Sequence, residues 1–169
     1  MVVSIALLGK SGSGKTTVAA RLVEHHGFQT ISSGKVCREV AHIVFAREDK
    51  ETLNNISLAI RKIDQNAFLE AALRDAKPNR DIVFDSIRYK SDYYYLKTIG
   101  YKFLKVEVER AILEQRLKIR GQAFTPDDLS HESEISLDTV ECDWTINNEN
   151  KGRENFLKEI DRVVSKLRM

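Results

Sequence analysis

The sequence has few of the residues that mark disulfide-rich, loop-rich or membrane proteins. Two cysteines and two prolines occur among 169 residues. Cys37 and Cys142 lie far apart without metal-ligand spacing, which fits two free thiols in a reducing compartment. The apolar run at residues 2–8 is too short to span a membrane and lacks the basic start of a signal peptide. We therefore expect a cytoplasmic protein that does not act at a membrane.

Neither sign of charge dominates the composition. Lys and Arg number 27 against 25 for Asp and Glu, so no strong overall field points to a nucleic acid polymer or a membrane surface as partner. Hydrophobic residues make up 42% and charged residues 31%, which is typical of a folded globular protein. This length fits one domain over residues 1–169. We expect that domain to act as a monomer or a homodimer.

Apolar segments of strand length alternate with segments of helical periodicity. Strands are expected at about 2–8, 28–31, 81–85, 101–108 and 144–146, and helices near 14–25, 36–44, 51–76, 91–99, 110–120, 134–140 and 153–167. The pattern over 51–76 favours two helical pieces that end before Pro78, and Ser91 is expected to cap the next helix. The alternation predicts an α/β fold in three layers, α/β/α, around a five-stranded parallel sheet.

A glycine-rich loop follows the first predicted strand and opens the first predicted helix. It fits the pattern G-x-x-x-x-G-K-[ST], in which glycines let backbone N–H groups wrap a phosphate at a helix N-terminus. Lys15 is expected to reach the β- and γ-phosphates of ATP, and the Thr16 hydroxyl to bind Mg²⁺. A plain glycine turn would not require the Lys-Thr pair. The predicted nucleotide ligands here are Gly9, Ser11, Gly12, Ser13, Gly14, Lys15, Thr16 and Thr17.

GTPases, motor-type ATPases and small-molecule kinases all use such a loop, so other residues must separate them. A GTPase would carry an Asn-Lys-x-Asp string to read guanine, and the nearest string, Asn147-Asn148-Glu149, lacks the Lys-x-Asp continuation. A motor-type ATPase would place a Glu after the aspartate that ends the third strand, whereas Ser86 follows Asp85 here. The sequence therefore favours a kinase that uses ATP and Mg²⁺.

Four arginines fall at predicted strand ends and loop mouths. Arg38 lies one turn into the helix after the second strand, and Arg88 follows the carboxyl end of the third strand. Arg116 and Arg120 are four residues apart, so they share a helix face. The guanidinium group can hold two phosphate oxygens at once. Each arginine alone could be a solvated surface residue, but the set suits a site that brings two phosphorylated molecules together.

Several segments resemble nucleoside and deoxynucleoside monophosphate kinases, an adenylate kinase-like P-loop family. The segment from Ile31 to Arg38 resembles their Ile-Ser-x-Gly-Asp-x-x-Arg string, and Asp85 to Arg88 is similar to their Asp-Gly-x-Arg. Arg116 to Arg120 resembles the Arg-x-x-x-Arg of their lid. Asp143 to Asn148 resembles a stretch of dephospho-coenzyme A kinases and phage-type deoxynucleotide kinases, and His131 to Glu134 resembles a His-x-Ser-Glu string of the deoxynucleotide branch.

The resemblance implies a helical acceptor-binding insertion at about 32–76 and a short lid at about 116–133. The adenine of ATP would lie near Asn147 and Asn148, with Arg116 also on the nucleotide. Asp85 would orient water bound to Mg²⁺. The implied acceptor ligands are Ser33, Gly34, Arg38, Arg88 and Asp92. The implied catalytic residues are Lys15, Asp85, Arg88, Arg116 and Arg120.

Two departures from adenylate kinases disfavour adenosine monophosphate as the acceptor. Lys35 stands where those enzymes have Asp, and Asp92 stands where they have the glutamine that reads the base. The predicted function is ATP-dependent phosphoryl transfer to a (deoxy)nucleoside monophosphate, giving the diphosphate and ADP. Two alternatives stay open. One is a dephospho-coenzyme A kinase-like enzyme with a hydroxyl acceptor and Asp85 as base, and the other is a nucleotide-binding regulatory protein without turnover.

Overall fold

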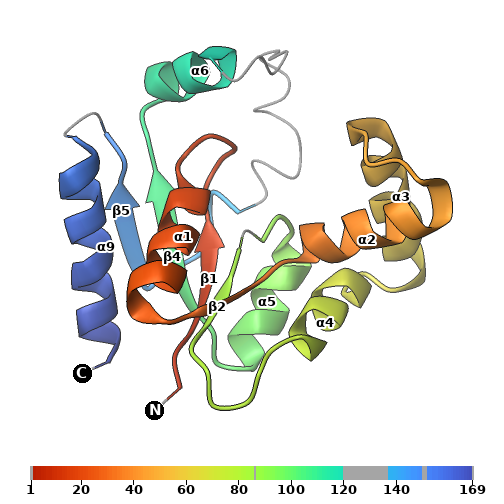
Figure 1. The fold of residues 1–169 in the computed structure, drawn as a ribbon, viewed down its shortest axis with the longest axis horizontal. Helices are drawn as coiled ribbons and strands as arrows, with labels where there is room; N and C mark the ends of the chain where they lie inside the picture. The colour runs from red at the N-terminus through yellow and green to blue at the C-terminus, as the bar shows by residue number, and fades with distance from the viewer. Residues whose placement is uncertain (1, 86, 120–136, 150–151, 169) are drawn as a thin grey trace.

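The computed structural model describes residues 2–85, 87–119, 137–149 and 152–168. Strands and helices alternate along the chain much as predicted (Figure 1). The elements are β1 (Ser4–Leu8), α1 (Lys15–His26), β2 (Gln29–Ile31), α2 (Ser33–Phe45), α3 (Lys50–Ile63), α4 (Ala67–Arg74), β3 (Ile82–Phe84), α5 (Lys90–Thr98), β4 (Lys102–Glu107), α6 (Arg110–Ile119), β5 (Trp144–Asn147) and α9 (Arg153–Leu167).

The five strands form one parallel sheet in the order β2-β3-β1-β4-β5. β1 pairs with β3 on one side and with β4 on the other, so the loop that follows β1 lies over the middle of the sheet. The strands that follow β1 in the chain are added on both sides of it, so the strand order reverses at β1. Open α/β sheets bind their ligands at such a position, beyond the carboxyl ends of the strands. The central place of β1 also explains why Ile5, Ala6, Leu7 and Leu8 are all 0% exposed.

Helices cover both faces of the sheet, which confirms the three-layer α/β/α fold. On one face, Ile5 and Leu7 pack with residues of α1 and α9, among them Leu22. On the other face, Ala6 and Leu8 pack with residues of α4 and α5. Successive residues of a strand point to opposite faces, so β1 contributes to both cores.

Helices α2, α3 and α4 form an insertion to one side of the sheet (Figure 1). α2 packs on both α3 and α4. The helical pattern over 51–76 divides into two pieces as predicted, and Asp49 starts α3 by accepting a hydrogen bond from the Thr52 N–H at 2.9 Å. The core between α2 and α3 is small, with Cys37, Ala41 and Ile56 buried. These helices lie in the predicted insertion at 32–76, and their role in acceptor binding stays a prediction.

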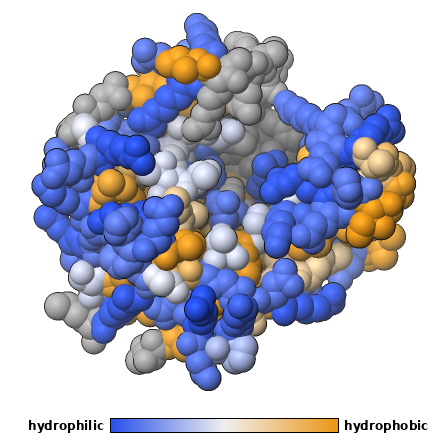
Figure 2. All heavy atoms as spheres, in the orientation of Figure 1, coloured by the Kyte–Doolittle hydropathy of each residue, from blue (hydrophilic) through white to orange (hydrophobic). Residues whose placement is uncertain are grey.

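Apolar side chains gather at the outer edge of this insertion (Figure 2). Ile43, Val44 and Phe45 on α2 are exposed, as are Leu58 and Ile63 on α3. None of the described helices is long and apolar enough to cross a membrane. The oligomeric state, monomer or homodimer, stays a prediction.

Two local expectations are corrected or limited by the structure. α5 begins at Lys90 with Tyr89 as its N-cap, so the prediction that Ser91 caps this helix is wrong. The backbone amides of Arg88 and Tyr89 face the carboxylate of Asp92, which takes the capping role from the third helical position.

Of the helix predicted at 134–140, the described part, residues 137–140, is a turn and bend. The rest of it lies outside the described residues, as do residues 120–133 of the predicted lid.

Asp161 on α9 joins two basic side chains of α1. Its carboxylate accepts hydrogen bonds from Nε and Nη2 of Arg21 at 3.0 and 2.8 Å and lies 2.7 Å from Nε2 of His26. The hydrogen bond from Arg21 is the main cause that lowers the pKa of Asp161 to about 2. A carboxyl whose pKa is lowered by folding stabilises the fold above its unfolded value, about 3.9, and loses that contribution as the pH falls toward its folded value.

Asp161→Asn should therefore lower the urea midpoint of unfolding at neutral pH. Between pH 5 and pH 2 the midpoint of this variant should fall less steeply than that of the wild type, because the titrating carboxyl is gone. Glu159→Gln, an exposed change on the same helix, should follow the wild type. A wild-type slope in the Asp161 variant would contradict the assignment. Circular dichroism in urea at each pH makes the measurement.

Candidate functional site

The loop from Gly9 to Thr16 turns at the carboxyl end of β1. Gly9, Gly12 and Gly14 have positive φ angles of 139°, 83° and 114°. A Cβ at Gly9 would collide with the carbonyl oxygen of Val106 on β4 and would lie 2.8 Å from Oγ of Ser13. The loop therefore needs glycine both for its turn and for its close approach to the neighbouring strand.

Gly9→Ala should destabilise the protein by more than the backbone conformation alone costs. Gly27→Ala is the matched control, since Gly27 also has a positive φ of 74° but open space around its Cα. That control should lose about 1 kcal/mol of unfolding free energy from the left-handed conformation. The Gly9 variant should lose more, because the methyl group meets the Val106 carbonyl. Equal losses in urea titrations would contradict the close approach.

Lys15 begins α1 and its ammonium group turns back onto the loop. It donates hydrogen bonds to the carbonyl oxygens of Gly9 and of Lys10, the latter at 2.9 Å. The Ser13 side chain of the same loop is buried, and its Oγ has no hydrogen-bond partner among the described residues. The first N–H groups of any α-helix also lack intrahelical acceptors. A phosphate on this loop would meet all of these donors, so the loop fits the triphosphate of ATP.

Asp85 follows β3 at the same edge of the sheet and is the centre of a cluster of charges. Its backbone N–H donates to the carbonyl oxygen of Ile31 at 2.8 Å, which ties it to the end of β2. Burial raises the pKa of the Asp85 carboxyl, and the positive charges of Lys15, Arg38 and Arg88 oppose this rise. All three cations therefore lie close enough to act on one carboxylate. They come from three segments: the start of α1, helix α2 and the turn before α5.

Two further predicted acceptor residues lie beside Arg38. Ser33 and Gly34 form the first turn of α2. A Cβ at Gly34 would lie 3.6 Å from Nη1 of Arg38, so the guanidinium group runs back along the helix over this glycine. Ser33, Gly34 and Arg38 therefore share the start of α2, as the sequence predicts.

Arg116 of α6 lies on the other side of the loop. Its Nη2 donates to the carbonyl oxygen of Asn148 at 3.2 Å, and Nη1 donates to that of Gly12 at 3.5 Å. Nδ2 of Asn148 donates in turn to the Ser13 carbonyl at 2.7 Å. This cluster borders a cavity of about 450 Å³. The cavity is lined by Gly12, Gly14, Thr17, Arg116, Asn148, Glu149, Gly152 and Arg153.

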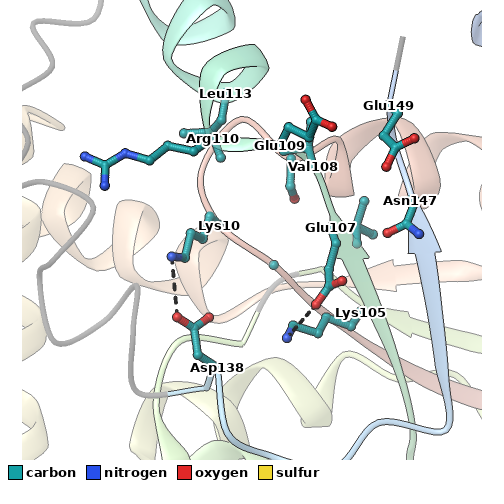
Figure 3. Close-up of a pocket in the computed structure, with 13 residues that line it drawn as sticks. Lys10, Lys105, Glu107, Val108, Glu109, Arg110, Leu113, Asp138, Asn147 and Glu149 are labelled. Carbon is teal, nitrogen blue, oxygen red and sulfur yellow. Dashed lines mark ion pairs between the residues drawn. The ribbon is translucent and has the colours of Figure 1, made fainter. Parts of the chain in front are cut away.

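A second cavity of about 610 Å³ lies beyond the carboxyl ends of β4 and β5 (Figure 3). Two ion pairs border it: Lys105 lies 2.8 Å from Glu107, and Lys10 lies 3.4 Å from Asp138. Asn147 borders this cavity, whereas Asn148 borders the smaller one. The two asparagines predicted to lie near adenine therefore serve different cavities, and Asn148 is the one joined to Arg116 and the loop.

Mg²⁺ prefers oxygen ligands, and Thr16 and Asp85 both offer them. Within the ranges that the structure describes, no group of three or more His, Cys, Asp or Glu side chains could hold a metal ion alone. An ion shared between these two residues and the phosphates of a nucleotide needs no such group, so the donor set fits Mg²⁺.

Some predicted site residues do not join these clusters. Asp92 is only 5% exposed, and its carboxylate faces Arg61 and two backbone amides. Arg120 and the segment from His131 to Glu134 lie outside the described residues.

Two further arginines, Arg61 and Arg153, are given no role by the sequence. Arg153 borders the 450 Å³ cavity from the start of α9. Its place in the first turn of the last predicted helix was the only feature of the sequence that could have indicated this position. Arg61 is the partner that the buried Asp92 requires.

Several solved structures share this fold over almost the whole chain. A shikimate kinase from Bacteroides thetaiotaomicron has a TM-score of 0.65 at 16% identity, with 99% of each chain covered. A shikimate kinase from Acinetobacter baumannii, in complex with shikimate, has a TM-score of 0.62 at 17% identity and covers 98% of this chain and 95% of its own. A gluconokinase from Sinorhizobium meliloti 1021 has a TM-score of 0.52 at 20% identity, with 98% and 95% covered. At these identities the likeness shows the fold alone.

Fold and loop together define this protein as a P-loop protein with the fold of small-molecule kinases. The chain belongs to the AAA domain family AAA_17, whose model matches residues 8–133. That range contains the phosphate loop, Arg38, Asp85, Arg88 and both arginines of the predicted lid. The P-loop kinase family expected from the motifs is confirmed.

The chain is also similar to one named relative. It is 37% identical over 76 residues to a protein of Vairimorpha ceranae (strain BRL01) named "Probable cytidylate kinase". The match covers 43% of this chain and 35% of that protein, so the chain aligns with about a third of its relative's length.

Proposed function

We propose that this protein transfers the γ-phosphoryl group of Mg-ATP to the phosphate of a (deoxy)nucleoside monophosphate, giving the diphosphate and ADP. The observation that carries this proposal is the convergence of Lys15, Arg38 and Arg88 on Asp85. Two phosphorylated substrates bring many negative charges into one place, and cations from both sides offset them. An acceptor phosphate is already ionised at neutral pH, so this transfer needs no general base. We expect the enzyme to act in the cytoplasm, with no polymer or membrane as partner.

On the donor side, the loop would hold the triphosphate through its N–H groups while Lys15 neutralises the β- and γ-phosphates. When bound, Mg²⁺ would be held by Thr16 and, through water, by Asp85, and would draw charge from the same oxygens. The cavity beside Arg116 and Asn148 is the proposed place for adenine. Arg116 would move from its contact with the Asn148 carbonyl toward the transferring group, and Arg120 is proposed to act with it.

On the acceptor side, Arg38 and Arg88 would hold the acceptor phosphate, with Ser33 and Gly34 at the start of α2 beside it. In-line positioning of the two phosphates would supply most of the catalysis, because phosphoryl transfer asks little covalent chemistry of the protein. The name of the relative, a cytidylate kinase, supports a nucleotide as the acceptor. The departures at Lys35 and Asp92 support an acceptor other than adenosine monophosphate.

A hydroxyl acceptor, as in a dephospho-coenzyme A kinase-like enzyme, is a second candidate. Burial raises the pKa of Asp85, which suits a carboxylate that accepts a proton from a hydroxyl group. The structural relatives include proteins named shikimate kinase and gluconokinase. We prefer a nucleotide acceptor because two arginines, Arg38 and Arg88, act on this carboxylate, and both are proposed to hold an acceptor phosphate.

An acceptor panel in a coupled ADP-release assay tests the proposal. It would contain ribo- and deoxyribonucleoside monophosphates, dephospho-coenzyme A, shikimate and gluconate, each with Mg-ATP. We expect at least one nucleoside monophosphate to raise ADP release about 100-fold above hydrolysis. Stimulation by a hydroxyl acceptor alone would replace the proposal with the second candidate. Tight ATP binding without turnover on any acceptor would indicate a regulatory nucleotide-binding protein.

A further inference from the structure

Arg61, in the last turn of α3, is surrounded by contacts to the turn that begins α5. Its Nη2 donates to Oγ of Ser91 at 2.9 Å, and Nη1 lies 3.5 Å from Oδ1 of Asp92. The guanidinium carbon lies 3.6 Å from the centre of the Tyr89 ring. Nη1 also donates to the carbonyl oxygen of Gln65 at 2.7 Å, just beyond the end of α3. One side chain, 20% exposed, thus joins α3 to three residues of the α5 turn.

Asp92 passes this connection to the backbone at Arg88. Its carboxylate is buried and faces the backbone amides of Arg88 and Tyr89. Burial raises the pKa of this carboxyl, and Arg61 is the main group that opposes the rise. Arg61 therefore favours the charged form of the carboxyl group that faces the two amides. Without Arg61, the buried carboxylate of Asp92 would lose the side-chain cation that faces it. Such a loss lowers the stability of the folded protein considerably.

The rest of α3 is weakly attached. It packs chiefly on α2 and has Ile56 as its only buried residue. The start of α2 carries Arg38, and the turn before α5 carries Arg88. The contacts of Arg61 therefore connect the insertion that holds one acceptor arginine to the turn that holds the other.

We propose that Arg61 and Asp92 are positioning residues that set the backbone at Arg88 and hold the insertion at the distance from it that an acceptor phosphate requires. This inference rests on the proposed function, because it assumes that Arg38 and Arg88 bind one acceptor. It assigns Asp92 a different role from the one its sequence position suggests. Asp92 is covered by Arg61 and by its own helix start, so it acts through Arg88 rather than on the acceptor base.

Substitutions at both ends of the pair, read by two independent measurements, test the inference. The variants are Arg61→Gln, Arg61→Lys and Asp92→Asn, with Lys62→Gln as control, since Lys62 is the exposed neighbour on the same helix. Steady-state kinetics with the acceptor found in the panel gives the KM values for acceptor and ATP. Amide hydrogen exchange on the ligand-free protein reports on the N–H groups of Arg88 and Tyr89.

We expect Arg61→Gln and Asp92→Asn to raise the acceptor KM about 10-fold or more, with the ATP KM within about threefold of the wild type. Exchange at the two amides should be faster in both variants. The acceptor KM of Arg61→Lys should lie between those of the wild type and Arg61→Gln. A lysine keeps the positive charge but lacks the planar guanidinium group with its several N–H donors. The double variant, Arg61→Gln with Asp92→Asn, should raise the acceptor KM by less than the product of the two single increases, because the two residues act as one unit. Lys62→Gln should match the wild type in both measurements.

The two measurements separate this inference from the function beneath it. Equal rises in both KM values, or unchanged exchange at Arg88 and Tyr89, would overturn the positioning role. Faster exchange combined with no stimulation by any nucleotide would support the connection to the Arg88 backbone and reject the proposed function. If Arg61→Gln does not fold, as judged by circular dichroism, Arg61→Lys carries the same test.

Discussion

Lys15→Ala should lower kcat by at least about 100-fold, equivalent to about 3 kcal/mol of transition-state stabilisation. The ammonium group lies against the loop, with hydrogen bonds to the carbonyls of Gly9 and Lys10. Its charge also opposes the rise that burial causes in the pKa of Asp85. A charge held this way is in place before the transition state forms, so its removal affects the rate directly. Coupled ADP release at saturating ATP and acceptor provides the measurement.

Lys10→Ala is the matched control for this variant. Lys10 belongs to the same loop, but its side chain pairs with Asp138 at 3.4 Å rather than turning inward. This control should keep kcat within about threefold of the wild type, as expected for an exposed ion pair. If Lys15→Ala kept wild-type kcat, the donor phosphates would not lie on this loop as proposed.

Arg88→Ala should raise the KM of the acceptor about 30- to 100-fold, because charge-assisted hydrogen bonds to a phosphate contribute about 2–3 kcal/mol. The KM of ATP should change little, since the donor phosphates are held by the loop. Arg80→Ala, an exposed arginine before β3, is the control and should leave both KM values unchanged. Equal rises in the two KM values would contradict a specific role of Arg88 in binding the acceptor.

Most of the secondary structure followed from the sequence because its signals are local. β1 was recognised from its nearly continuous apolar run, and all but its first described residue are buried as expected. α1 ends where Gly27 takes a φ of 74°, as the glycine after an amphipathic stretch predicts. The phosphate loop was equally local, since eight consecutive residues contain the whole motif.

The errors and omissions concern residues whose roles depend on distant partners. Ser91 carries a good capping side chain, but its Oγ instead accepts a hydrogen bond from Arg61, thirty positions earlier. Asp92 takes over the cap because it lies at the third helical position, facing the backbone amides. Nothing in the residues near Arg61 shows that a buried carboxylate will face it. Asn147 and Asn148 are neighbours in the chain, yet they border different cavities at the end of β5.

Local sequence was sufficient for the parallel α/β class and the phosphate loop. It also singled out a set of arginines, whose binding of phosphates stays a prediction. Each of these depends on a property of a short segment: the spacing of its apolar residues, the conformational freedom of its glycines or the chemistry of its side chains. Tertiary structure alone decided which cations meet. The strand order placed β3 between β1 and β2. The segments that follow the carboxyl ends of β1, β2 and β3 then brought Lys15, Arg38 and Arg88 to Asp85. Strand order and ion pairs such as Arg61 with Asp92 arise from packing between segments far apart in the chain, which no short-range pattern encodes.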